Sequence, residues 1–193
     1  MTQAIIFDCF GVLTTEGWIA FKNQHFGNDP QKMRRATELS RMLDRGLISY
    51  EDSVKETAEM AGVSVEELDN TLRKLTSNKP LLEYIRDELK PKYKIGLLSN
   101  VGNDWLYTLF TDQEKALFDE AALSFQTGVL KPERQAFEII AQKLALPPED
   151  CVLVDDLERN ITGAQEAGMQ AILYKNFDQL KTDLEALLAN PKG

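Results

Sequence analysis

A short apolar run ended by a carboxylate constrains this chain more than any other feature. Residues 4–7, Ala-Ile-Ile-Phe, have the unbroken apolar pattern of a strand buried on both faces of a parallel sheet. Asp8 follows at once, and Gly11 allows a sharp turn where the strand leaves the core. Ligands of open parallel sheets bind at the carboxyl ends of strands. The run therefore predicts either a functional carboxylate at the sheet edge or an aspartate that only starts a turn.

Similar runs recur in the second half of the chain, separated by helical patterns. Further strands are expected at 94–98, ending in Ser99-Asn100, at 119–124, at 151–154, ending in Asp155-Asp156, and at 171–174. Helices are expected from about Pro80 to Pro91, through Trp105, Leu106 and Leu109, from Pro132 to Pro147, up to Gly168, and over 177–189. Strands that alternate with helices imply a parallel sheet with right-handed crossovers, so the predicted fold class is α/β.

Residues 17–78 differ, because they hold amphipathic helical patterns and almost no strand pattern. Predicted N-caps are Asp29, Ser49 and Ser64, with Gly46 and Gly62 as terminators. Leu68, Leu72 and Leu75 follow the last cap at intervals of four and three residues, which indicates one apolar helix face. This block therefore predicts a small helical subdomain.

Charge and cysteine content exclude several classes of protein. The formal net charge of −9 over 193 residues argues against nucleic-acid and anionic-membrane partners. No apolar stretch reaches the length of a membrane span, and the N-terminus resembles neither a signal peptide nor an anchor. The two cysteines, Cys9 and Cys151, sit in apolar runs like small buried residues, which favours a reducing compartment such as the cytoplasm. The composition predicts no oligomeric state.

The polar residues at the predicted strand ends would meet at one edge of the sheet. Three aspartates brought together, Asp8, Asp155 and Asp156, would repel one another unless a cation lay among them. Carboxylates, carbonyls and waters suit Mg²⁺ and leave room for a phosphate, and Lys131 would add a positive charge. Taken singly, each of these residues has a simpler interpretation as a helix cap or a solvated side chain.

Four segments resemble, in the expected order, the motifs of the haloacid dehalogenase-like (HAD) superfamily. They are Phe-Asp-Cys-Phe-Gly-Val-Leu at 7–13, Leu-Leu-Ser-Asn at 97–100, Gly-Val-Leu-Lys-Pro at 128–132 and Val-Asp-Asp-Leu-Glu-Arg-Asn at 154–160. The resemblance covers nearly the whole chain. It implies a three-layer Rossmann-like core with a parallel sheet, formed by residues 1–15 and 79–193. Residues 16–78 would be an all-helical cap of the C1 type, inserted after the first strand.

The resemblance also implies a role for each site residue. Asp8 would be the nucleophile that forms an aspartyl phosphate, and Lys131 would steady it and the transferred group. Ser99, Asn100 and the backbone at Cys9 and Phe10 would bind the phosphate of a small phosphorylated metabolite. Asp8, Asp156 and the Phe10 carbonyl would hold Mg²⁺, with Asp155 bonding through water and Asn160 in support behind them.

One position departs from the family pattern. Family phosphatases usually carry a second aspartate two residues after the nucleophile, as general acid and base, and this chain has Phe10 there. Because such help is typically worth about 10²–10⁴ in rate, its absence predicts a slow enzyme, a substrate with a good leaving group, or an acid supplied by another group. An aromatic residue at this position is also similar to the pattern of the 2-haloacid dehalogenases, which need no metal. Those enzymes, however, tend to lack a pair of aspartates such as Asp155 and Asp156. The alternatives are thus a dehalogenase-type hydrolase and a weakly active or non-catalytic binding protein.

Overall fold

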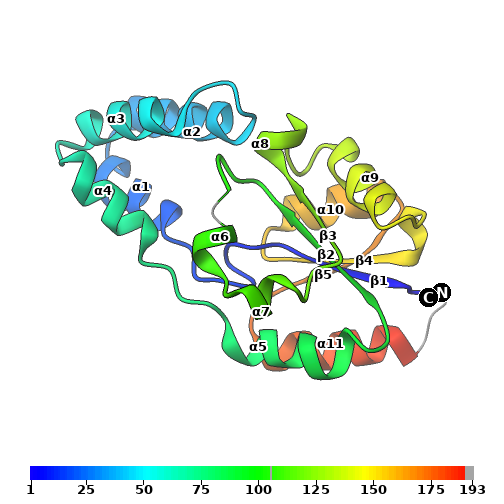
Figure 1. Ribbon diagram of the computed structural model, residues 1–193. Helices are drawn as coiled ribbons and strands as arrows, with labels where there is room; N and C mark the ends of the chain where they lie inside the picture. Colours follow the sequence, from blue (N-terminus) through cyan, green and yellow to red (C-terminus); the bar gives the residue numbers. More distant parts are fainter. Residues whose placement is uncertain (105, 190–193) are drawn as a thin grey trace.

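The computed structural model describes residues 1–104 and 106–189, and it contains a parallel sheet of five strands in the order β3-β2-β1-β4-β5 (Figure 1). The strands are β1 (Ala4–Phe7), β2 (Lys94–Ser99), β3 (Glu120–Leu123), β4 (Cys151–Asp155) and β5 (Gln170–Leu173). All five predicted strands are confirmed to within a residue or two at each end. The α/β fold class is confirmed as well.

β1 is the central strand, and all of its residues are buried. Ile5 pairs with Ile95 on one side and with Val152 on the other, so the first run of the chain joins the two halves of the sheet. Ala4 and Ile6 point to one face and Ile5 and Phe7 to the other, which is why the run needs apolar side chains throughout.

Helices cover both faces of the sheet and complete a three-layer core. One face packs against α9 (Arg134–Lys143) and α10 (Glu158–Glu166) through residues such as Phe137 and Ala164. The other packs against α5 (Lys79–Tyr84), the π-helical turn η1 (Ile85–Leu89) and α11 (Phe177–Ala189), through Leu81, Ile85 and Leu180. Figure 1 shows these two helical layers above and below the sheet.

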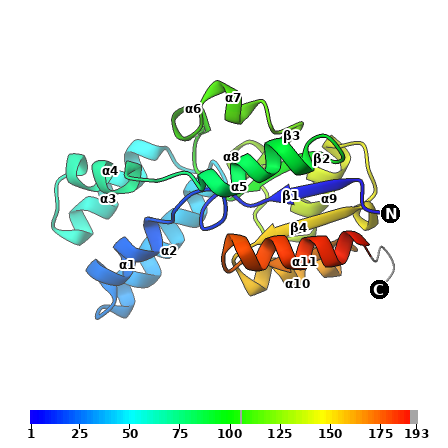
Figure 2. The same cartoon turned by 90° about the horizontal axis from the view of Figure 1, so that it is seen from below.

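Four helices, α1 (Trp18–Phe26), α2 (Pro30–Asp44), α3 (Tyr50–Ala61) and α4 (Val65–Arg73), form what we call the helical segment, residues 18–73. The predicted N-caps are confirmed, since the side chains of Asp29, Ser49 and Ser64 each accept backbone N–H bonds from the first turn of their helix. The segment has its own buried cluster around Phe26 and Leu68. It stands beside the carboxyl edge of the sheet (Figure 2).

Shorter elements complete the fold: α6 (Leu106–Leu109), α7 (Asp112–Lys115), α8 (Ser124–Thr127) and the 3₁₀ turn η2 (Pro148–Asp150). The helix expected through Trp105 is reduced to α6, and Trp105 itself lies outside the described residues. None of the described helices combines the length and the apolar character that crossing a bilayer requires.

The helix expected from Pro132 is present but starts two residues later, at Arg134 of α9. The reason is tertiary. The Asn100 side chain accepts a hydrogen bond from Lys131 N at 2.9 Å and donates one to Lys131 O at 3.0 Å, so the chain before α9 is tied to the end of β2. Glu133 is still extended and serves as the N-cap position.

Candidate active site

Parallel pairing brings the ends of β1, β2 and β4 to one edge of the sheet. Phe7 lies opposite Leu97 and Val154, so the residues that follow these three emerge side by side. Asp8 continues the strand direction by donating its N–H to Val154 O at 2.9 Å. Asp8, Ser99 and Asp155 are all buried there, as the sequence predicted for residues at a shared edge.

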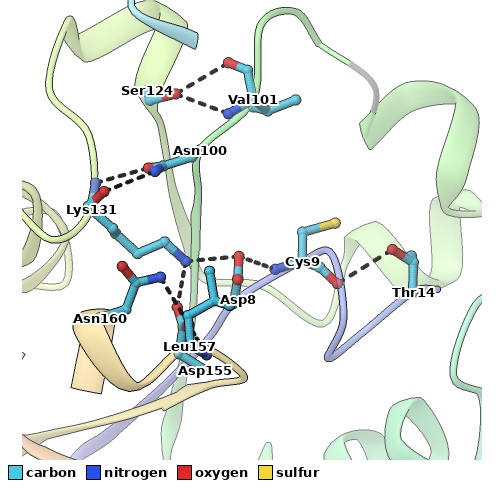
Figure 3. Close-up of polar contacts among 10 residues, drawn as sticks. All are labelled: Asp8, Cys9, Thr14, Asn100, Val101, Ser124, Lys131, Asp155, Leu157 and Asn160. Carbon is cyan, nitrogen blue, oxygen red and sulfur yellow. Dashed lines mark hydrogen bonds and ion pairs between the residues drawn. The ribbon is translucent and has the colours of Figure 1, made fainter. Parts of the chain in front are cut away.

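Lys131 joins two of the carboxylates. Its Nζ lies 2.8 Å from Asp8 Oδ1 and 2.6 Å from Asp155 Oδ2, and all three side chains are at least nine-tenths buried (Figure 3). Burial alone would lower the pKa of Lys131, but the charges of Asp8 and Asp155 outweigh it and raise the pKa. Lys131 is therefore held as a cation, and it fixes the direction of Asp8.

Asp155 is held by the protein on both of its oxygens. Oδ2 takes the Lys131 contact, while Oδ1 accepts hydrogen bonds from Asn160 Nδ2 at 2.9 Å and from Leu157 N at 3.0 Å (Figure 3). A fully buried carboxylate needs such partners because desolvation of an unpaired charge is costly. The geometry makes Asp155 a support for Lys131, and it brings Asn160 into the same network.

Asp8 remains short of positive charge despite Lys131. Burial raises its pKa to about 7, the Lys131 charge opposes this rise, and the Asp155 charge adds to it. Its Oδ1 also accepts the Cys9 N–H at 2.7 Å. A carboxylate in these surroundings gains stability as an anion when a further cation is bound.

Asp156 reaches the same place because residue 11 has no side chain. A Cβ on Gly11, which has φ +87°, would lie 2.3 Å from Asp156 Oδ2. Asp156 Oδ1 is buried, and the described residues offer it no hydrogen-bond partner. Burial, followed by the charge of Asp155, raises the pKa of Asp156. The carboxylate is thus kept close to Asp8, and the charges of Lys131 and Arg159 only partly offset its own.

The donor set fits a divalent cation. Ligand atoms of Asp8, Asp155 and Asp156 all lie within 4.8 Å of one another. Carboxylate oxygens are the ligands that Mg²⁺ prefers. Because Asp155 is already engaged on both oxygens, Asp8 and Asp156 are the two carboxylates available for direct contact.

The remaining residues predicted for the site differ in their surroundings. Ser99 Oγ is buried and has no partner in the part of the chain that the structure describes. Phe10 lines the cavity next to Asp8. The Asn100 side chain is occupied by the Lys131 backbone, as described above. Burial raises the pKa of Cys9 to about 12, so its thiol stays protonated and Cys9 behaves as the small buried residue that was expected.

Ser124 is a supporting residue that the sequence did not reveal. Its Oγ accepts the Val101 N–H at 2.9 Å and lies 3.2 Å from Val101 O, which fixes the chain just beyond Ser99 and Asn100 (Figure 3). The only signal was its place at the end of a weakly indicated strand, 119–124. A polar residue at a strand end carries no information about which neighbouring loop it will contact.

Comparison with known proteins gives a consistent result. A family model described as haloacid dehalogenase-like hydrolase matches residues 2–168. Among curated proteins, drimenol cyclase drtB of Aspergillus calidoustus is 23% identical over 199 residues, covering 99% of this chain. The chain spans only 37% of that protein's length.

Two solved structures share the fold over most of both chains. A HAD family enzyme of Bacteroides thetaiotaomicron, in complex with magnesium and inorganic phosphate, has a TM-score of 0.76 at 25% identity and covers 93% of this chain and 99% of its own. A protein of Porphyromonas gingivalis, described as a predicted HAD-like family hydrolase, has a TM-score of 0.77 at 24% identity, and the match covers 97% of this chain and 98% of its own.

Proposed function

The chain belongs to the haloacid dehalogenase-like hydrolases, and from this premise we propose that it is a Mg²⁺-dependent phosphatase that acts on a small phosphorylated metabolite. The observation that carries the proposal is the pairing of a held nucleophile, Asp8 against Lys131 at 2.8 Å, with the unpartnered Asp156 oxygen beside it. The Bacteroides relative binds both magnesium and phosphate, which supports the same chemistry here.

In this mechanism Asp8 attacks phosphorus. A carboxylate oxygen of Asp8 forms a bond to phosphorus while the bond between phosphorus and the leaving alcohol oxygen breaks. The alkoxide leaves with the electron pair and takes a proton from solvent. Water then attacks phosphorus of the aspartyl phosphate, the Asp8 carboxylate leaves, and inorganic phosphate is released.

Asp8, Asp156 and the Phe10 carbonyl would hold Mg²⁺, with Asp155 nearby. When bound, the ion offsets the negative charge of the three aspartates and of the phosphate. The Lys131 charge favours the ionised form of Asp8, and its ammonium lies where it can also contact a phosphate oxygen. Ser99 Oγ would donate to another phosphate oxygen, because a ligand would satisfy a hydroxyl that is otherwise buried without a partner.

Asn100, Asp155 and Asn160 act on the substrate indirectly in this proposal. Asn100 holds the Lys131 backbone at 2.9 and 3.0 Å, and Asn160 holds Asp155, which holds the Lys131 ammonium. The Cys9 N–H is directed to Asp8 rather than to a ligand. These contacts keep the nucleophile and the lysine in one geometry, which is the main requirement of phosphoryl transfer.

Phe10 affects the rate in this scheme. Its side chain cannot protonate the leaving alkoxide, so alkyl phosphates should turn over slowly. p-Nitrophenyl phosphate, whose leaving group scarcely needs a proton, is the appropriate first substrate.

We also assign residues 16–78 as a cap on a core of residues 1–15 and 79–193, because the helical segment has a buried cluster of its own.

The test is hydrolysis of p-nitrophenyl phosphate by purified protein with Mg²⁺, with chelator, and with Mg²⁺ restored after the chelator. We expect release of phosphate with Mg²⁺, loss of activity with chelator, and recovery when the ion is restored. Chloride release from 2-chloropropionate that is unaffected by chelator would instead identify a dehalogenase. Failure to turn over either compound would contradict the proposed activity.

A further inference from the structure

A single cavity of about 750 Å³ connects the candidate active site with the interior of the helical segment. At one end it is lined by Asp8, Phe10 and Asp156, and at the other by Val54 of α3 and Leu72 of α4. Pockets that enclose a whole small-molecule ligand typically measure about 300–1,000 Å³. The space is therefore much larger than inorganic phosphate needs, and the rest of it is available to the alcohol part of a substrate.

Apolar surface makes up most of the cavity lining, although Lys22, Thr37, Ser40, Arg41, Asp44, Tyr50, Ser53 and Thr57 contribute polar groups to it. The apolar side chains that line it in the helical segment are Trp18, Ile19, Leu43, Val54, Leu68 and Leu72. They come from all four helices of the segment. Ile19 is 44% exposed and lines the cavity, so a ligand there would have apolar surface to cover. Covering such surface with an apolar ligand is favourable in proportion to the area removed from water.

Charged residues of both signs line the cavity, among them Lys22, Arg41, Asp44 and Arg159. Lys22 experiences the opposite charges of Glu16 and Asp44, so the three already form a group of mixed sign. Burial lowers the pKa of Lys22 and raises the pKa of Asp44 to about 7. Both shifts have the direction expected in a poorly hydrated environment, where an apolar group loses less than a polar one.

We infer that the substrate is the phosphomonoester of an apolar alcohol, with its phosphate at Asp8, Ser99 and Lys131 and its hydrocarbon part along α1 and α4. This inference rests on the proposed phosphatase function and names its substrate class. Phe10 fits the same scheme, because it offers an apolar contact beside the reacting phosphate. A hydroxyl group placed against Ile19, Val54 or Leu72 would lose hydrogen bonds to water, so these positions favour a hydrocarbon group.

The first measurement is binding of methylphosphonate and hexylphosphonate to the Mg²⁺-loaded protein by calorimetry. In both compounds carbon replaces the ester oxygen, so neither can be hydrolysed as an ester. Because a buried methylene contributes up to about a fourfold gain in affinity, we expect hexylphosphonate to bind at least about 30-fold more tightly. Equal affinities for the two compounds would overturn the inference.

Two wall variants and a matched control locate the effect. Leu72→Lys and Ile19→Lys each add a charge to a different wall, and we expect each to reduce the hexyl-to-methyl ratio at least about fivefold. Val65→Lys lies on the same helix as Leu72, but its side chain is 49% exposed and is not part of the wall, so its ratio should match the original protein. An unchanged ratio in both wall variants, with melting temperatures showing them folded, would contradict the inference.

Hydrolysis of p-nitrophenyl phosphate, measured in parallel, separates this inference from the proposed function. Hydrolysis of p-nitrophenyl phosphate together with equal affinities for the two phosphonates would refute the apolar substrate but not the phosphatase function. Tighter binding of hexylphosphonate without hydrolysis of any phosphomonoester would refute the phosphatase function and support the apolar binding site. Tighter binding of hexylphosphonate together with hydrolysis supports both.

Discussion

The carboxyl edge of the sheet and the helical segment differ in the burial of their ion pairs. At the sheet edge, Asp8, Lys131 and Asp155 are buried and joined at 2.6 and 2.8 Å. In the helical segment the ion pairs lie at the surface, as for Arg35 with Glu56, both of which are 41% exposed. Its interior contains an apolar cluster, and the cavity beside it is lined by apolar and polar side chains.

This difference fits the proposed roles of the two regions, with the reaction at the sheet edge and substrate recognition in the helical segment. Buried charges on neighbouring strand ends can be held in one geometry, because the strands are fixed on both sides and their partners cannot move away. A wall of apolar helix faces imposes shape and hydrophobicity without directional contacts. We therefore expect changes at the sheet edge to affect catalysis and global stability, and changes in the helical segment to act locally.

The largest effect is expected for Asp8→Asn. The amide keeps the shape of the carboxylate but is not a nucleophile, so turnover of p-nitrophenyl phosphate should fall at least about 10³-fold. The matched control is Asp178→Asn on the exposed start of α11, which should retain full activity. Activity of Asp8→Asn within tenfold of the original protein would exclude Asp8 as the nucleophile.

Lys131→Ala should be the most destabilising single change at the sheet edge. It leaves Asp8 and Asp155 buried together without their shared cation, which typically costs about 3–5 kcal/mol of unfolding free energy. Arg134→Ala, which breaks an exposed pair with Glu138, should cost less than about 1 kcal/mol. Urea denaturation measures both, and similar losses would remove the distinction between the two kinds of ion pair.

Cavity-forming changes test whether the two regions unfold separately. Ile6→Ala in β1 and Phe26→Ala in α1 each remove a fully buried side chain, at a cost of about 2–5 kcal/mol. Hydrogen exchange should show lost protection throughout the protein for Ile6→Ala, but only in α1 to α4 for Phe26→Ala, because every neighbour in the Phe26 cluster belongs to residues 18–72. An equal loss in β1 for Phe26→Ala would contradict the predicted cap and core.

Phe10→Asp should increase the rate on alkyl phosphates. If proton delivery to the leaving alkoxide limits turnover, a carboxyl at this position should raise kcat by about 10- to 100-fold. Turnover of p-nitrophenyl phosphate, which scarcely needs a proton, should change little. Steady-state kinetics on hexyl phosphate and p-nitrophenyl phosphate provide the comparison. An equal change on both substrates would mean that Phe10 acts through packing instead.

The smallest effect is expected from Asp44→Asn in the helical segment. Burial raises the pKa of Asp44 to about 7, so the folded protein holds this proton more tightly than the unfolded chain does. The unfolding free energy therefore decreases as pH rises from about 4 to 7, and Asn removes that loss. The variant should gain about 1 kcal/mol at pH 5.5 relative to pH 4.5 by thermal denaturation. If the unfolding free energies of the variant and the original protein differ by the same amount at both pH values, this prediction is contradicted.

Local patterns in the sequence predicted much of the molecule. The apolar runs identified the five strands, and the three caps Asp29, Ser49 and Ser64 were confirmed by their backbone contacts. Asp8, Ser99 and Asp155 could be assigned to one edge because the ends of parallel strands share it. These features depend on a residue and its near neighbours, or on a rule about strand direction, and both can be found in a linear sequence.

Contacts between distant residues were decided only by the tertiary structure. The Asn100 side chain holds the Lys131 backbone and moves the start of α9 to Arg134, and Gly11 makes room for Asp156. The cavity forms where four helices and three strand ends come together. Each depends on which surfaces are brought into contact when the chain folds, and that information is spread over the whole chain rather than contained in any one segment.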